Sequence, residues 1–179
     1  MQRQLSVAVG VCVMFVWSSA LAEKKMHACS LLTSAEVGDA VGTHVGQFQE
    51  SDIVIPEGPS QGETMGGCMW PIDDGQSMVS VSVMRTPQGA QRGAGLTQLN
   101  QILAGLKGQG WTEEKKTIGN AMCATLTPPP SETPAPIAVG CLAEAKQMGI
   151  SVGWMTGKGK KVAPEKIKAL LDTVIGRLP

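Results

Sequence analysis

The chain has 179 residues, enough for one domain or at most two very small ones. Its 15 Lys and Arg balance its 15 Asp and Glu, so there is no net positive field to concentrate the protein on nucleic acid. Apolar residues make up 42%, too many for a disordered chain, and aromatic residues only 3%, too few for a surface on which bases stack. We therefore expect a globular protein that binds no nucleic acid.

The first 22 residues have the pattern of an export signal. Arg3 precedes an apolar run from Leu5 to Trp17, and Ala20 and Ala22 fit the small-residue rule for cleavage before Glu23. The run is shorter than the roughly 20 residues of a membrane-spanning helix, although its retention as an anchor is the alternative. We expect a signal peptide over residues 1–22 and one periplasmic or secreted domain over residues 23–179, with no transmembrane segment after signal removal.

Four cysteines remain after the signal: Cys29, Cys68, Cys123 and Cys141. An even number in an exported chain indicates two disulfides, for which three pairings exist. Zinc sites of four thiolates contain closely spaced pairs such as C-x-x-C, and these cysteines are far apart in the sequence. We therefore predict disulfides and no metal at the cysteines.

Two hairpins bear on the cysteine pairing. Asp73–Gln76 is typical of a four-residue turn, and a register in which Ile72 faces Ser77 places Cys68 and Trp70 on the apolar face of the sheet. Further along, the proline-rich segment 128–136 cannot form a ladder because proline lacks the N–H donor. If this segment is a hairpin loop, Cys123 and Cys141 lie opposite each other on adjacent strands, within disulfide range.

A further hairpin follows Cys141. With Lys146 and Gln147 as its loop, Trp154 lies opposite Val139 on an apolar face. Lys-Gln is unfavourable for a two-residue turn, so a longer loop that uses Gly149 is the alternative.

Helical patterns lie at the start, middle and end of the predicted domain. Thr33 and Glu36 form a capping-box pattern for a helix over 33–42, leucines recur at helical spacing over 88–108, and a last helix begins near Pro164. Strands are expected at 44–49, 67–72, 77–85, 111–118 and 121–127 and in the hairpin after the proline-rich segment. The order is helix, three strands, helix, four strands, helix, which predicts an α+β fold with antiparallel sheet, helices on one face and two disulfides.

The sequence contains little catalytic chemistry. Only two histidines exist, His27 and His44, and neither belongs to a nucleophile or zinc-protease motif. Asp73 and Asp74 form a carboxylate pair, but the turn chemistry of Asp-Gly accounts for them better. We predict that the protein is not an enzyme and that it needs no cofactor.

Two clusters suggest binding. Met65, Met69 and Trp70 are candidates for a soft metal such as Cu(I), which prefers thioether ligands, although methionine usually fills space in cores. Lys158, Lys160 and Lys161 form a basic patch that could contact an anionic envelope polymer or a lipid headgroup, although charge runs are usually solvated surface.

A resemblance supports the envelope interpretation. The segments Cys29-Ser30-Leu31-Leu32-Thr33-x-x-Glu36-Val37, Gly67-Cys68-Met69-Trp70, Ile118-Gly119-Asn120-Ala121 and Arg177-Leu178-Pro179 resemble small bacterial envelope proteins and lipoproteins of unknown function. The resemblance implies a Cys29–Cys68 bridge and an extracytoplasmic domain, and it supplies no catalytic residue. The sequence thus predicts a non-enzymatic binding or envelope-associated protein with an envelope protein or polymer as its partner. The alternative is a copper-binding protein or copper chaperone that uses Met side chains.

Overall fold

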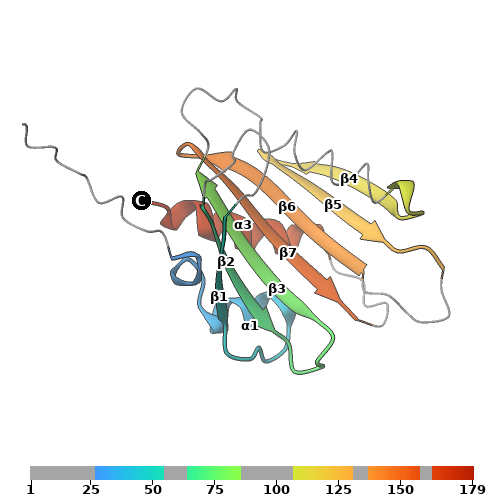
Figure 1. Ribbon diagram of the computed structural model, residues 1–179, viewed down its shortest axis with the longest axis horizontal. Helices are drawn as coiled ribbons and strands as arrows, with labels where there is room; N and C mark the ends of the chain where they lie inside the picture. Colours follow the sequence, from blue (N-terminus) through green and yellow to red (C-terminus); the bar gives the residue numbers. More distant parts are fainter. Residues whose placement is uncertain (1–26, 55–63, 86–106, 131–136, 158–162) are drawn as a thin grey trace, which may run out of the picture.

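The computed structural model describes residues 27–54, 64–85, 107–130, 137–157 and 163–179, which form one antiparallel sheet with helices on one side (Figure 1). In chain order the elements are η1 (Ala28–Ser30), α1 (Ser34–Val41), β1 (Gln49–Val54), β2 (Thr64–Pro71), β3 (Met78–Arg85), β4 (Thr112–Ile118), β5 (Ala121–Thr127), β6 (Ile137–Ala145), β7 (Met148–Thr156) and α3 (Pro164–Arg177).

The seven strands lie in the order β1-β2-β3-β7-β6-β5-β4. All neighbours are antiparallel, and every neighbouring pair except β3 and β7 is consecutive in the chain. The β3–β7 pairing joins the two sets of strands, so the predicted antiparallel α+β fold is one continuous sheet. Of the three expected helices, the first and the last lie on one face of the sheet (Figure 1), and both expected disulfides are present.

We call the sheet face covered by α1 and α3 the inner face, and the opposite one the outer face (Figure 1). On β3 the inner face carries buried valines, and the outer face carries two serines flanked by two methionines, all half-buried. Helix α3 covers the inner face with four buried side chains at helical spacing: Ile167, Leu170, Leu171 and Val174. This alternation follows the period of two that a sheet with one buried face imposes.

The predicted hairpin registers are confirmed. Cys68 lies opposite Val81 and Trp70 opposite Val79, while Val139 lies opposite Trp154. The β6–β7 loop is the two-residue turn, because Lys146 and Gln147 both adopt positive φ, at 50° and 62°. Such a turn matches the twist of the flanking strands, and the pairing of the strands outweighs the poor fit of these two residues to left-handed backbone.

Both predicted bridges are present. Cys29 in η1 is bonded to Cys68 in β2, with Cα atoms 5.0 Å apart. Cys123 and Cys141 face each other on β5 and β6, with Cα atoms 4.0 Å apart. All four residues belong to the buried core.

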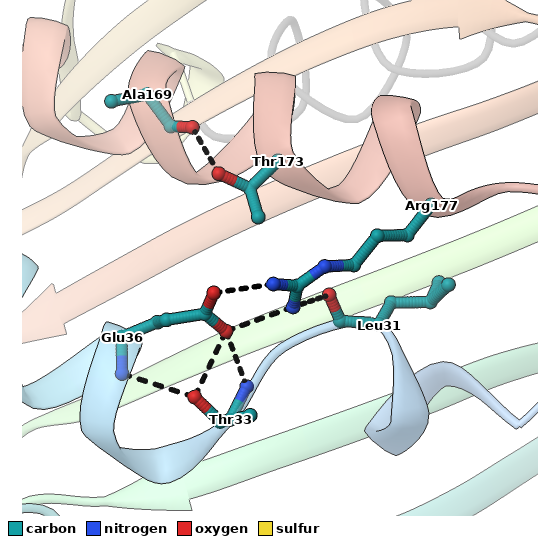
Figure 2. Close-up of polar contacts among 6 residues, drawn as sticks. All are labelled: Leu31, Thr33, Glu36, Ala169, Thr173 and Arg177. Carbon is teal, nitrogen blue, oxygen red and sulfur yellow. Dashed lines mark hydrogen bonds and ion pairs between the residues drawn. The ribbon is translucent and has the colours of Figure 1, made fainter.

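Helices α1 and α3 are joined by a polar network (Figure 2). The Thr33 hydroxyl accepts from the Glu36 N–H, and the Glu36 carboxylate accepts from the Thr33 N–H, which confirms the predicted capping box. Arg177, in the last turn of α3, donates to the same carboxylate and to the carbonyl oxygen of Leu31. The first and last helices of the described chain are therefore tied at one carboxylate.

The first strand lies later than predicted. The expected strand over 44–49 is reduced to an isolated bridge between Val45 and Ile72, and β1 begins only at Gln49. Gly46 still donates its N–H to the Pro71 carbonyl, but Pro71 has no N–H to return, so the ladder is interrupted beside it.

Two other predictions fall largely on residues outside the described ranges. The signal peptide over 1–22 lies there, and of the helix predicted over 88–108 only the end at Lys107 and Gly108 is described, where it is helical. Within the described residues, no helix is long and apolar enough to cross a membrane.

Candidate functional site

A polar hollow of about 430 Å³ lies on the inner face, beside the start of α3. Strands β4 and β5 form one side, and the first residues of α3 form the other. Its polar lining residues are Glu114, Lys116, Thr125, Thr127 and Glu165, and Cys123, Ile137 and Pro164 complete the lining.

The hollow exists because α3 begins over the middle of the sheet. Pro164 lies in the first turn of α3. The ends of β4 and β5 at which Thr112 pairs with Thr127 extend beyond this turn. There Glu114 pairs with Thr125, and Lys116 pairs with Cys123. Because β4 is an edge strand, charged residues on both of its faces are tolerated and also discourage pairing with another chain.

An ion pair spans the hollow from sheet to helix. The Lys116 ammonium donates to the carboxylate of Glu165, and this hydrogen bond lowers the pKa of Glu165 below its ordinary value. Both side chains are more than half exposed, so solvent screens the pair and its contribution to stability is small. The ion pair instead positions two polar groups in the lining of the hollow, the Lys116 ammonium as a donor and the Glu165 carboxylate as an acceptor.

The disulfide Cys123–Cys141 forms the back of the hollow. Each of its cysteines is 1% exposed, and the Cys141 sulfur lies 3.6 Å from the Pro164 carbonyl oxygen. A disulfide sulfur has no proton to donate, so this is a packing contact. This contact places the start of α3 against β6. The side of the hollow that Cys123 lines is linked covalently to β6 by the disulfide.

The chemistry of the hollow suits recognition. Glu114 and Glu165 supply acceptors, Lys116 supplies donors, and Thr125 and Thr127 supply hydroxyls that do both. Two carboxylates against one ammonium leave a formal charge of −1. At the start of α3, Ala163 makes no side-chain capping hydrogen bond, so backbone N–H groups of the first turn are not capped by it.

The residues predicted as a metal site are not brought together. Met65 and Met69 lie on the outer face of β2, four residues apart and so separated by roughly 13 Å along the strand. Trp70 lies on the inner face with 0% exposure, and the ring of Phe48 packs edge-on against it at a centroid distance of 6.4 Å. The three side chains therefore point to two different sides of the sheet.

The other sequence candidates are dispersed or undescribed. Lys158, Lys160 and Lys161 lie outside the described residues. His27 is paired with Glu50 at 2.9 Å, and His44 is paired with Asp73 at 3.0 Å, all on the exposed surface. In the described ranges, no group of three or more His, Cys, Asp or Glu could hold a metal ion.

Asp74 has the predicted turn role. It accepts hydrogen bonds from the N–H groups of Gln76 and Ser77, and its second oxygen accepts from the Ser77 hydroxyl.

Sequence reasoning missed the hollow. The sequence predicts only two strands in this region, over 111–118 and 121–127. The available signal is the run Glu113–Lys116, which places charge on both faces of a strand, beside threonines on its partner. A strand whose inner face is charged cannot be covered by an apolar helix without cost, so such a run indicates an uncovered end of the sheet.

The comparisons with known proteins bear on the fold. No protein-family model and no curated protein matches the sequence. Among solved structures, the chain is similar to the extracellular domain of PknH from Mycobacterium tuberculosis, with a TM-score of 0.55 and 15% identity. The match covers 84% of this chain and 93% of that one, so the similarity in fold extends over most of both chains.

Proposed function

We propose that the protein is a periplasmic or secreted, non-enzymatic binding protein whose polar hollow takes a small ligand. The observation that carries the proposal is a hollow lined by hydrogen-bond donors and acceptors and by the apolar side chains of Ile137 and Pro164, beside the Cys123–Cys141 disulfide. We propose binding over catalysis because the two carboxylates among the lining residues, Glu114 and Glu165, are exposed and so lack the burial that tunes a carboxyl group for acid–base chemistry.

Four lines of support point to this location. Two buried disulfides are expected in an oxidising compartment, and the predicted export signal would direct the chain to one. The similar fold of the PknH extracellular domain is consistent with this location. The resemblance to small bacterial envelope proteins points the same way, and an envelope protein or polymer is the partner we propose.

The ligand is inferred from the lining. Its formal charge of −1 favours a cation, and the threonine hydroxyls favour a ligand that itself carries hydroxyl groups. A volume of about 430 Å³ is at the lower end of the range for small-molecule sites. We therefore propose a hydroxylated amine of the size of an amino sugar, the amine against Glu114 and the hydroxyls against Thr125 and Thr127.

A matched pair of probes tests this proposal. Glucosamine carries the amine, whereas N-acetylglucosamine has the same ring without the positive charge. Amide NMR signals of Glu114, Thr125 and Thr127 should shift with glucosamine. Its affinity should exceed that of N-acetylglucosamine at least about tenfold, since a charge-assisted hydrogen bond contributes about 1.5–3 kcal/mol.

The control uses two carboxylates. Glu114→Gln should abolish the preference for glucosamine, whereas Glu144→Gln, on the opposite face of β6, should leave it unchanged. If neither sugar shifts the signals of the hollow, or if Glu144→Gln has the same effect as Glu114→Gln, the proposal is wrong.

A further inference from the structure

The outer face of the sheet is unusual in composition. Its central positions carry small residues, among them Ser80, Ser82, Gly140, Ser151 and Gly153, which lie side by side across β3, β7 and β6. Methionines surround this region. A thioether on a half-exposed sheet face gains less from burial than one in a core, so space-filling alone accounts poorly for them.

The register gathers three of these methionines. Met78 on β3 lies directly opposite Met155 on β7. On the other side of β3, Met69 of β2 faces Ser80, which places it diagonally next to Met78. Directly opposed positions have Cβ atoms about 4.5–5.5 Å apart and diagonal ones somewhat under 7–8 Å, distances that long flexible side chains bridge. Three adjacent strands thus each contribute one thioether to one area.

The sheet surface beside this cluster is formed by small residues. Ser80 and Gly153 are paired next to Met78 and Met155, and a Cβ at Gly153 would lie only 3.1 Å from the Ser80 Oγ. A larger side chain would therefore crowd this position. The Met69, Met78 and Met155 side chains can fold over the glycine and the serine without displacing a bulky neighbour.

The cluster is accessible. Met155 is 39% exposed, one of only two large apolar side chains in the described residues that are exposed, and Met69 and Met78 are half-buried. The other outer-face pair differs from it. Met84 lies opposite Met65, and its methyl carbon is 4.0 Å from the position of a Cβ on Gly149, so Met84 covers the sheet as ordinary packing.

We propose that Met69, Met78 and Met155 form a binding site for a soft monovalent cation, Cu(I), on the outer face of the sheet. Thioethers are soft, uncharged ligands that favour Cu(I), whereas hard cations such as Mg²⁺ and Ca²⁺ require oxygen ligands. The three hydrogen-bonded strands fix the backbone positions of the three methionines, and their flexible side chains let the sulfur atoms converge. The site lies on the face opposite the polar hollow and is independent of it.

Competition for Cu(I) tests the site. The protein is prepared with both disulfides formed and with Cys12→Ser, because Cys12 is the one cysteine outside the bridges and a thiol would bind Cu(I) itself. Under anaerobic conditions with ascorbate, which keeps copper reduced, the protein should withdraw one equivalent of Cu(I) from its bicinchoninate complex. With Ag(I) as a redox-stable probe, the methyl NMR signals of Met69, Met78 and Met155 should shift.

Leucine variants provide the matched control, because Leu conserves the volume of Met and removes the sulfur. Met78→Leu and Met155→Leu should each weaken Cu(I) binding at least tenfold, whereas Met65→Leu on the same face should leave it unchanged. The proposal is overturned if the unsubstituted protein withdraws no Cu(I), or if Met65→Leu weakens binding as much as Met155→Leu. It is also overturned if the methyl signals of all methionines shift alike, which would indicate non-specific binding.

Discussion

Arg177 donates two hydrogen bonds to the carboxylate of Glu36, although the two residues are 141 positions apart in the chain. The same carboxylate accepts from the N–H and the hydroxyl of Thr33 and so caps the start of α1 (Figure 2). The guanidinium of Arg177 and the two donors of Thr33 lower the pKa of Glu36 from 4.5 to about 2. One side chain therefore completes a helix cap and joins the two ends of the described chain.

This contact predicts a stability that depends on pH. Because the pKa of Glu36 is lowered on folding, the ionised form is favoured in the folded state, and its contribution is fully present above pH 4.5. It is lost as pH falls from 4.5 to about 2. The side chain is 34% exposed, so we discount the full shift for solvent screening to about 1–2 kcal/mol.

Urea unfolding at pH 6 and near pH 2 measures this contribution. Glu36→Gln should lower the free energy of unfolding by about 1–2 kcal/mol at pH 6 and have little effect near pH 2. Asp39→Asn, at an exposed position of the same helix, is the control and should not show this difference. An equal loss for Glu36→Gln at both pH values would contradict the role of the ionised carboxylate.

Trp154 and Met155 are adjacent in sequence and lie on opposite faces of β7. Trp154 is 8% exposed and packs between Val79 and Val139. Its indole N–H has no hydrogen-bond partner among the described residues, so we expect its contribution to stability to come from packing. Trp154→Ala should lower the free energy of unfolding by about 3–5 kcal/mol. Met155→Ala, at an exposed position, should change it by less than about 0.5 kcal/mol. Chemical denaturation of both variants measures the difference, and similar losses would mean that the faces are assigned wrongly.

Much of this local structure could be predicted because its causes are local. The register of β2 and β3 follows from the turn Asp73–Gln76 and the alternation of valines, and a single-residue slip would turn Cys68 and Trp70 to the wrong face. The opposition of Cys123 and Cys141 follows likewise from their equal distances to the proline-rich loop.

The rest depends on contacts that sequence spacing does not encode. The pairing of β3 with β7 and the contact of Glu36 with Arg177 join distant segments, and nothing in the local pattern selects them. The charged run Glu113–Lys116 indicates an uncovered end of the sheet, but the polar hollow itself depends on where α3 begins over the sheet, which sequence spacing does not encode. The methionine candidates failed to converge because Met69 and Trp70 are consecutive on a strand and so point to opposite faces.

The turn between β6 and β7 offers a stabilising substitution. Gln147 has a φ of 62°, a left-handed conformation that costs a non-glycine residue about 1 kcal/mol. Gln147→Gly should therefore raise the free energy of unfolding by about 0.5–1 kcal/mol, which a higher midpoint of thermal unfolding would show. Lys146 is left unchanged because its ammonium donates to the Leu178 carbonyl at 2.5 Å. Gln147→Ala keeps the unfavourable conformation and should give no gain, and an equal gain from both variants would show that the turn conformation is not the cause.

The two disulfides should contribute unequally to stability. Cys29–Cys68 closes a loop of 39 residues and Cys123–Cys141 one of 18, and on the chain-entropy account these constraints contribute nearly 4 and about 3 kcal/mol. The second bridge also joins strands that are already hydrogen-bonded as neighbours, whereas the first fixes η1 to β2 outside the sheet ladder. Loss of Cys29–Cys68 should therefore destabilise the protein more.

Double substitutions to Ser separate the two bridges, and urea unfolding of each variant at the same pH gives the ranking. Since a domain of this size has a total stability of only about 5–15 kcal/mol, removing both bridges should leave it unfolded or nearly so at 37 °C. Non-reducing peptide mapping of the unsubstituted protein checks the pairing directly. A peptide that links Cys29 to Cys123 or Cys141 would refute both bridges, and with them the hairpin around the proline-rich loop. If the variant that lacks Cys123–Cys141 proved the less stable of the two, loop length would not govern the ranking. The contact of this disulfide with the start of α3 would then contribute more to stability than the longer loop closed by Cys29–Cys68.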